Sequence, residues 1–194
     1  MTMKDSDIRQ VVLSDLGRKY ENDTDTVIIE ELGLCQGEAR VDIAVVNGLI
    51  HGFEIKSDQD TLKRLPGQAV IYNRVLDSVS LVVGSKHLDE ALKVVPKWWG
   101  VVEAKKSKRN VGLHEIRANQ KNPVLDPEAI IQLIWRHEAL EVLRKRGLHR
   151  GYVSKTKWVL WDRIIEKLSL NELREEVRST IKSRGNWRSV QPLK

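Results

Sequence analysis

The sequence predicts an α/β fold in which a mixed β-sheet core, in the order α-β-β-β-α-β, precedes a mainly helical C-terminal region. Three observations carry this prediction. Apolar residues at helical spacing open the chain, three strand-like runs follow them, and every periodic segment after residue 119 has the spacing of a helix. We expect the core to span residues 1–118 and the basic, mainly helical region to span residues 119–194.

The first part of the core begins with a helix and continues with three strands. Ile8, Val12 and Leu16 share one face of a helix expected over Ser6 to Tyr20. Short runs rich in β-branched and apolar residues then predict three strands, over 26–30, 40–46 and 49–56. Asn47-Gly48 between the last two runs is a strong hairpin signal.

The second part of the core alternates helices and strands. We expect a helix from about Asp60 to Leu76, with Pro66 opening its main body as a first-turn residue. The further expected elements are a buried strand over 78–83, a short helix over 88–95, and strands over 99–104 and 112–118.

The C-terminal region is expected to contain three helices. Asp126-Pro127-Glu128 combines a capping acceptor, a first-turn proline and an acid near the positive helix end, so it predicts a helix start. That helix is expected to reach Arg146 and to end at Gly147, and two more are expected over 155–168 and 171–184.

Composition excludes several classes of protein. No apolar run approaches the roughly 20 residues of a membrane span, and the charged start MTMKDSDIRQ is unlike a signal peptide. The single cysteine, Cys35, has no partner for an internal disulfide or a cysteine zinc site. The five histidines lack the spacing of metal ligands and are expected at the surface or in packing roles. These features predict a cytoplasmic protein without membrane contact.

Charge is divided unevenly along the chain. Residues 1–96 carry 11 Lys and Arg against 16 Asp and Glu, whereas residues 97–194 carry 22 against 11. An acidic half suits a bound cation, and a basic half suits a polyanion such as nucleic acid.

Residues 37–58, GEARVDIAVVNGLIHGFEIKSD, carry the most informative pattern. Asp42 lies on one arm of the expected hairpin, and Glu54 and Lys56 lie on the other. Because side chains alternate along a strand, Glu54 and Lys56 share a face. Carboxylates that hold a divalent metal, beside a cation near the attacking water, are what phosphodiester hydrolysis requires. The alternative is an ordinary exposed Glu-Lys pair, but charges on strands that are otherwise apolar need a partner or a metal.

This arrangement resembles the PD-(D/E)xK superfamily, which has the restriction-endonuclease-like fold. The resemblance covers roughly residues 5–84. The motifs in this region, including EELGL, ARVDI and EIKSD, are similar to those of a group of small bacterial and phage proteins predicted to be nucleases. It implies that Asp42 and Glu54 bind Mg²⁺ or Mn²⁺ and that Lys56 orients or deprotonates water. The backbone carbonyl of Ile55 is an additional candidate metal ligand.

Further residues extend the expected site. Gln68 and Tyr72 resemble the Q-x-x-x-Y element of RecB-type nucleases, which contacts substrate, although a helix with one polar and one core aromatic position explains them as well. Arg64 is placed to reach a phosphate. Glu31, in preference to Glu30, is the candidate for an extra upstream metal ligand. Asp58 is another candidate ligand, and Asp60 is expected to cap the following helix.

The register of the hairpin is a condition for this site. A two-residue turn at Asn47-Gly48 would pair Asp42 with Phe53 and turn Asp42 away from Glu54. We therefore expect either an irregularity near His51-Gly52 or a three-residue turn.

The expected function is metal-dependent hydrolysis of DNA phosphodiesters, with the basic half binding the backbone. Tryptophans accompany these basic residues, and they either pack against the core or stack on unpaired bases; they are Trp135, Trp158, Trp161 and Trp187. The main alternative is a module that binds nucleic acid or protein without cutting. Assembly with itself or with a partner protein is also open.

Overall fold

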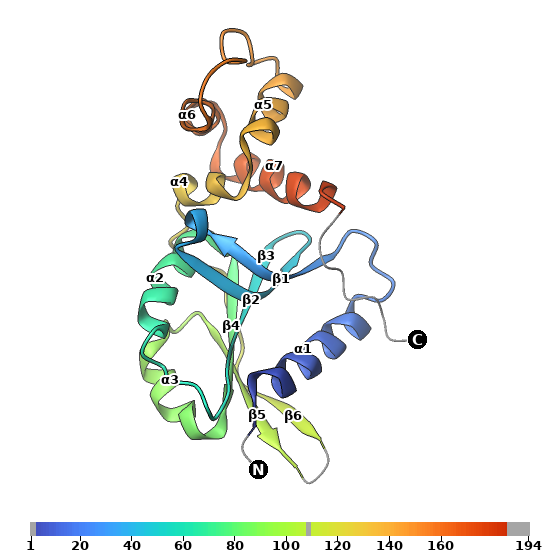
Figure 1. The fold of residues 1–194 in the computed structure, drawn as a ribbon, viewed down its shortest axis with the longest axis vertical. Coiled ribbons are helices and arrows are strands. Elements are labelled where there is room, and N and C mark those ends of the chain that lie inside the picture. Colours follow the sequence, from blue (N-terminus) through green and yellow to red (C-terminus); the bar gives the residue numbers. More distant parts are fainter. Residues whose placement is uncertain (1–2, 108–109, 186–194) are drawn as a thin grey trace.

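The computed structural model describes residues 3–107 and 110–185. Its centre is a six-stranded mixed sheet in the spatial order β1-β2-β3-β4-β5-β6 (Figure 1). The first three strands are antiparallel neighbours, β4 and β5 continue parallel to β3, and β6 is antiparallel to β5. The strands are β1 (Val27–Leu34), β2 (Ala39–Val46), β3 (Ile50–Lys56), β4 (Ser78–Gly84), β5 (Gly100–Lys106) and β6 (Val111–Arg117).

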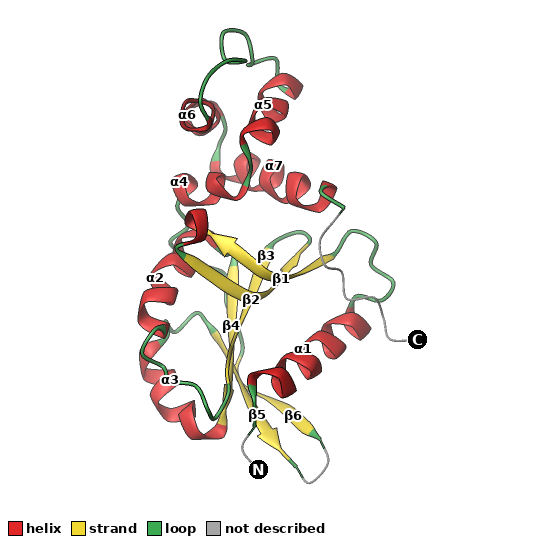
Figure 2. Ribbon diagram, viewed as in Figure 1, coloured by secondary structure: helices red, strands yellow, loops and turns green. Residues whose placement is uncertain are grey.

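Helices cover both faces and one end of this sheet (Figures 1 and 2). Helix α1 (Asp5–Lys19) lies on one face, and α2 (Leu65–Val75) and α3 (Leu88–Val94) lie on the other. The C-terminal helical part consists of α4 (Pro127–Ile130), α5 (Arg136–Lys145), α6 (Lys157–Lys167) and α7 (Leu170–Ser183). Three short 3-10 helices, η1 (Cys35–Gly37), η2 (Ser85–His87) and η3 (Ile131–Leu133), join these elements. The prediction of a mixed α/β fold with a helical C-terminal part is confirmed.

Two apolar clusters, one on each face, hold the layers together. Alternation along the strands separates Ile43, Val45 and Ile55, which pack with α1, from Ala44 and Val46, which pack in the cluster beneath α2. The C-terminal helices join the second cluster, which is the larger one.

The β2–β3 hairpin has the three-residue turn that the sequence analysis required. Val46 pairs with Ile50, which leaves Asn47, Gly48 and Leu49 in the turn. The alternative, an irregularity at Gly52, is wrong, because Gly52 pairs regularly with Ala44.

Gly52 is needed for packing instead. A Cβ atom at this position would lie 2.6 Å from Leu76 Cδ1 and 3.1 Å from Val41 Cγ2. The absence of a side chain therefore lets Leu76, at the end of α2, approach the sheet closely.

Two expected helix boundaries are wrong. Helix α2 begins at Leu65, because the Asp60 carboxylate accepts hydrogen bonds from Ser57 N (2.8 Å) and Ser57 Oγ (2.6 Å) and so forms a turn rather than a helix cap. Pro66 stands in the first turn of α2 as expected.

The helix expected from residue 127 to Arg146 is divided into α4, η3 and α5. Asp126 caps α4 by accepting from Glu128 N, as expected. The chain is extended at Ile134 and Trp135, and α5 starts after them. Four apolar side chains, those of Ile130, Ile131, Leu133 and Ile134, are all buried. A continuous helix would spread so dense a run around its circumference, so the break allows all four to be buried.

Among the described residues, no helix is both long and apolar enough to cross a membrane.

Candidate functional site

Glu54 and Lys56 form the centre of the candidate site. Both project from β3 toward α2, and both are buried, with 1% and 6% of their surface exposed. The Lys56 ammonium group donates to Glu54 Oε1. The two charges therefore neutralise each other inside the protein, as buried charges must.

Helix α2 supplies two further contacts to the Glu54 carboxylate. Gln68 Nε2 donates to Oε1 at 2.7 Å, and the Tyr72 hydroxyl lies 2.5 Å from Oε2. That hydroxyl also lies 2.6 Å from the Arg40 carbonyl oxygen, and its single proton can serve only one of these acceptors at a time. Burial and the neighbouring Glu54 charge raise the pKa of Tyr72, so it stays protonated.

These contacts refine the roles expected for the Q-x-x-x-Y pair. Tyr72 is fully buried and contacts the carboxylate of Glu54. Gln68 Oε1 has no hydrogen-bond partner among the described residues, although it is buried. The structure therefore shows Gln68 and Tyr72 as partners of Glu54, and it does not test their expected contact with substrate.

Asp42 lies at the neighbouring end of β2. Its Oδ2 accepts from the backbone N–H of Ile55 at 2.7 Å, and its Oδ1 accepts from Arg9 Nη2, also at 2.7 Å. Burial and the nearby negative charge of Glu54 raise the pKa of Asp42 to about 6, against the lowering effect of those two donors. The negative charge of Glu54 on the adjacent strand β3 therefore acts on Asp42.

Arg9 is the residue that sequence reasoning missed. From α1 its guanidinium contacts Asp42, Glu31 Oε1 (3.1 Å) and Asp5 Oδ1 (3.1 Å). Burial lowers its pKa, but the carboxylates of Asp42 and Asp5 outweigh this effect and raise it. The sequence places Arg9 within the expected first helix, but it does not show the contact with Asp42, which lies 33 positions away.

Glu31 lies beside Asp42, whereas its neighbour Glu30 pairs regularly with Ile43. Glu31 has a left-handed backbone (φ 58°), which is uncommon for a residue with a side chain. Its carboxylate, which is 46% exposed, contacts Arg9 and, at 3.5 Å, Arg40. Such strain persists where the surrounding structure imposes it, and it is common at functional sites.

The oxygen donors of this site are of the type that binds a hard divalent cation, but in this structure they are paired with cationic side chains. Carboxylate oxygens are the ligands that Mg²⁺ and Mn²⁺ prefer. Within residues 3–107 and 110–185, no group of three His, Cys, Asp or Glu residues is arranged to hold a metal. Arg9 and Lys56 neutralise Asp42 and Glu54 instead. Ile55 is 2% exposed and contacts Asp42 through its N–H, so the structure gives no contact for its carbonyl at this site.

The remaining candidates lie around this centre. Arg64 is exposed immediately before α2 and precedes Gln68 by one turn. Asp58 lies beside the end of β4, where Gly84 leaves room for its carboxylate and Lys86 Nζ donates to its carbonyl oxygen at 3.3 Å. The structure does not bring Asp58 to Glu54 through any contact described here.

His51 has a packing role, as expected for the histidines. Its ring nitrogens lie 2.6 Å from Ser78 Oγ and 3.0 Å from Ser80 Oγ, and Asn119 Nδ2 lies 3.0 Å from Nδ1. Burial lowers the pKa of His51 to about 4, so the imidazole is neutral near pH 7.

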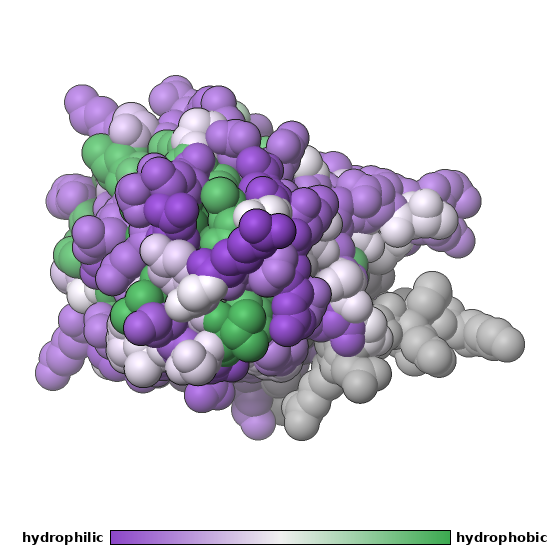
Figure 3. Space-filling model, turned by 90° about the horizontal axis from the view of Figure 1, so that it is seen from above, coloured by the Kyte–Doolittle hydropathy of each residue, from purple (hydrophilic) through white to green (hydrophobic). Residues whose placement is uncertain are grey.

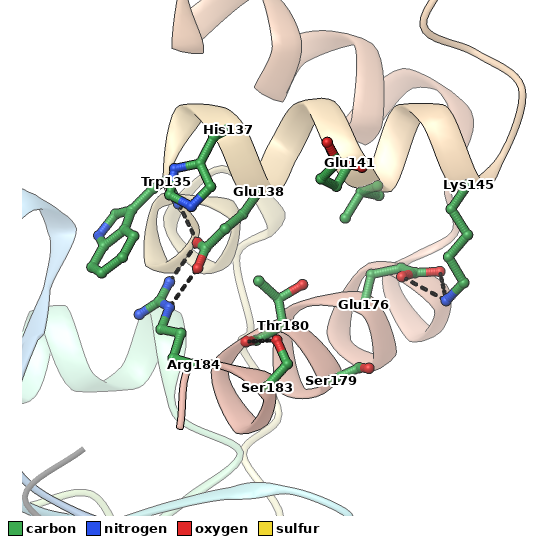
Figure 4. A pocket seen from close by; sticks show the side chains of 11 residues that line it. Trp135, His137, Glu138, Glu141, Lys145, Glu176, Ser179, Thr180, Ser183 and Arg184 are labelled. Atoms are coloured by element: carbon green, nitrogen blue, oxygen red, sulfur yellow. Dashed lines mark hydrogen bonds and ion pairs between the residues drawn. The ribbon is translucent and has the colours of Figure 1, made fainter. Parts of the chain in front are cut away.

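A groove of about 790 Å³ lies between α5 and α7, apart from the candidate site (Figure 4). Figure 4 shows that charged side chains lining it pair with each other, Arg184 with Glu138 and Lys145 with Glu176. None of the candidate catalytic residues lines it.

The tryptophans of the basic half are partly buried in the core and partly exposed, and stacking on bases is not tested by the structure. Trp161 is 4% exposed and packs in the core, whereas Trp135 and Trp158 are 57% and 53% exposed. Trp187 lies outside the described residues.

Comparison with known proteins corrects the family resemblance. Residues 1–192 match the family model "Bacteriophage P4 protein cII". Over 167 residues the chain is 32% identical to "Protein cII" of Enterobacteria phage P4. The matched region is 83% of this chain and 60% of that relative, so the chain spans about 60% of the length of the relative.

No solved structure matches this chain. Because the family model and this relative both point to the protein cII family, the assignment to the PD-(D/E)xK superfamily was wrong as a statement of family. The comparisons support the expected phage origin. The chain belongs to the bacteriophage P4 protein cII family.

Proposed function

We propose that this protein is a metal-dependent nuclease that hydrolyses phosphodiester bonds of DNA. The observation that carries the proposal is the convergence of Asp42 and Glu54 from the two arms of the β2–β3 hairpin, with the Lys56 ammonium group on Glu54. The order α1-β1-β2-β3-α2-β4 agrees with the restriction-endonuclease-like core that we propose.

Each residue has a defined role in this proposal. Asp42 and Glu54 would hold Mg²⁺ or Mn²⁺, with the Ile55 carbonyl and Glu31 as further oxygen donors. The metal, when bound, would offset negative charge on the phosphate and activate water. Lys56 would then orient the attacking water. Gln68 and Tyr72 would fix the Glu54 carboxylate, and Arg64 would contact a substrate phosphate.

The second candidate function is a module that binds nucleic acid without cutting it. A specific observation favours it, because Arg9 and Lys56 already neutralise the two acids that hydrolysis requires for a metal. A metal would have to displace at least the Arg9 guanidinium from Asp42. Both candidates predict contact with a polyanion, and they differ in cleavage.

Cleavage assays separate the two candidates. Purified protein is incubated with plasmid, linear duplex and single-stranded DNA, and with RNA, in Mg²⁺, in Mn²⁺ and in EDTA. The proposal predicts metal-dependent cleavage that falls by about 100-fold or more in Glu54→Gln and in Lys56→Ala.

Matched variants control for unrelated effects. Glu115→Gln on β6 and Lys93→Ala on α3 change the same residue types at exposed positions outside the site. They should cleave like the wild-type protein, and thermal unfolding should show that all four variants are folded. Cleavage that persists in Glu54→Gln would contradict the proposal, and salt-sensitive binding with no cleavage in any metal would favour the binding module.

A further inference from the structure

An exposed tryptophan of α6 stands among cations. Trp158 is 53% exposed, although buried aromatic area is a main source of stability. Its ring lies edge-on to Trp161 at 5.0 Å between centroids, and the Lys157 ammonium lies 4.7 Å from the Trp158 ring centre. These contacts hold the Trp158 ring in one orientation and leave the rest of its surface open to solvent.

The segment leading to Trp158 is entirely free of acids. Residues 142–161 contain six Lys and Arg and no Asp or Glu. Arg144, Lys145 and Arg146 have carboxylate partners in α5 and α7. Among the described residues, no ion pair with a carboxylate is found for the remaining three, which are Arg150, Lys155 and Lys157.

The same segment is held in place by backbone contacts. The Arg136 guanidinium donates to the carbonyl oxygens of Val153 (2.6 Å) and Lys155 (2.9 Å). The Arg136 guanidinium therefore adds a further positive charge to this segment, and carbonyl oxygens rather than a carboxylate bind it. We call the residues Arg150, Val153, Lys155, Lys157 and Trp158 the α6 surface.

The α6 surface adjoins the candidate site. Lys157 Nζ donates to Gln36 in η1, and η1 leads directly into β2. The first residues of β2 include Arg40, whose carbonyl oxygen contacts Tyr72 and whose side chain contacts Glu31. The contact of Lys157 with η1 therefore connects the α6 surface to the start of the strand that carries Asp42.

The distribution of hydrophobic residues on this end of the molecule favours a polar partner over an apolar one. Figure 3, which looks down on the C-terminal helical part, shows hydrophobic areas that are small and separated by hydrophilic residues. Stable protein interfaces have a larger apolar centre. A cationic surface with an isolated aromatic ring is typical of proteins that bind unpaired nucleic-acid strands.

We propose that the α6 surface binds an unpaired nucleic-acid strand, with one base stacked on Trp158 and phosphates near Arg150, Lys155 and Lys157. This inference rests on the proposed function only in placing the strand between this surface and the candidate site. It assigns the substrate class as single-stranded DNA or RNA.

Binding in the absence of divalent metal tests the proposal. Fluorescence anisotropy with labelled oligothymidine and oligouridine of about 20 nucleotides, and with a duplex of equal length, measures affinity in EDTA. Trp158→Ala should weaken binding of the unpaired strand by roughly tenfold, and Trp158→Phe should weaken it less, because stacking on one aromatic ring contributes on this scale. Affinity should fall steeply as salt is raised.

Trp135→Ala is the matched control. Trp135 is equally exposed and also carries a cation over its ring, that of Arg184, but it lies outside the acid-free segment. It should bind like the wild-type protein.

Three outcomes would overturn the inference: Trp158→Ala binding as tightly as the wild-type protein, Trp135→Ala weakening binding equally, or no binding of either unpaired strand. The last outcome would leave the α6 surface to a protein partner. Binding that depends on Trp158, with no cleavage in any metal, would support this inference and contradict the proposed hydrolysis. Cleavage in metal, with binding that is unchanged in Trp158→Ala, would support hydrolysis and contradict this inference.

Discussion

Acids in the two regions of the molecule behave in opposite ways. At the sheet, burial and the charge of Glu54 raise the pKa of Asp42 to about 6. In the C-terminal helical part, hydrogen bonds from Ser169 and Arg146 lower the pKa of Glu172 to about 2, and Arg184 and the Trp135 N–H lower that of Glu138 against the effect of burial. Acids in both regions have hydrogen-bond donors, but at the sheet burial and the second acid outweigh the donors of Asp42 and raise its pKa.

This difference separates the ion pairs that join elements of the fold from the acids of the candidate site. Ion pairs such as those of Arg184 with Glu138 and Arg174 with Asp77 connect elements distant in sequence, and their groups are mutually satisfied. Asp42 and Glu54 lie on the neighbouring inner strands β2 and β3, and an added cation would offset the repulsion between them. Unfavourable electrostatics of this kind is common at binding and catalytic sites.

The largest expected effect concerns the helical part. Asp77 is 4% exposed, accepts from Ile50 N at 2.7 Å and from Arg174 Nε at 2.8 Å, and so ties α7 to the sheet. Asp77→Ala should lower the free energy of unfolding by about 3–5 kcal/mol, because it leaves the buried Ile50 N–H without its acceptor and removes the carboxylate that pairs with the partly buried Arg174 guanidinium. Urea denaturation measures this change. A loss below about 1 kcal/mol would show that the pair is not structural.

A smaller effect is expected from pH at the sheet. The folded-state pKa of Asp42 exceeds its unfolded value of 3.8, so the native state binds more protons than the unfolded state between about pH 4 and pH 6. The contribution of Asp42 to stability is therefore largest at low pH and falls as pH rises through this range, by about 2 kcal/mol.

Comparison with Asp42→Asn isolates this contribution. The unfolding free energy of the wild-type protein minus that of the variant should decrease from pH 4 to pH 7. A difference that is constant or rises with pH would contradict the repulsion between Asp42 and Glu54.

The smallest effect concerns Arg9. If Arg9 competes with a metal for Asp42 and Glu31, Arg9→Gln should tighten Mn²⁺ binding by roughly fivefold, which is the scale of a partly exposed ion pair. Arg18→Gln, which removes a pair with Asp15 elsewhere on α1, is the control and should leave Mn²⁺ affinity unchanged. Weaker Mn²⁺ binding in Arg9→Gln would show instead that Arg9 organises the acids for the metal.

Features set by neighbouring residues could be predicted from the sequence. Alternation placed Glu54 and Lys56 on one face of β3. The side-chain geometry of the hairpin required either an irregularity near His51-Gly52 or a three-residue turn, and the turn is found. The cap at Asp126 and the first-turn position of Pro66 also depend on local chemistry alone.

Features set by tertiary contacts could not be predicted from the sequence. The ion pair of Arg9 with Asp42 joins α1 to β2 across 33 positions. The hydrogen bond of Tyr72 with Glu54 depends on where α2 lies over the sheet. The helix break at Ile134 follows from burial of consecutive apolar residues, and the periodic pattern there is equally compatible with one long helix. A short motif is likewise not sufficient to identify a family, and the comparisons with known proteins identified it instead.

Direct measurement of divalent metal binding tests the central claim, that Asp42 and Glu54 share one cation. Isothermal titration of the wild-type protein with Mn²⁺ should show one site per chain. Asp42→Asn and Glu54→Gln should each abolish it, and binding to the wild-type protein should weaken as pH falls below about 6, because the proton on Asp42 competes with the metal. Equal Mn²⁺ affinity in the wild-type protein and both variants would contradict the claim.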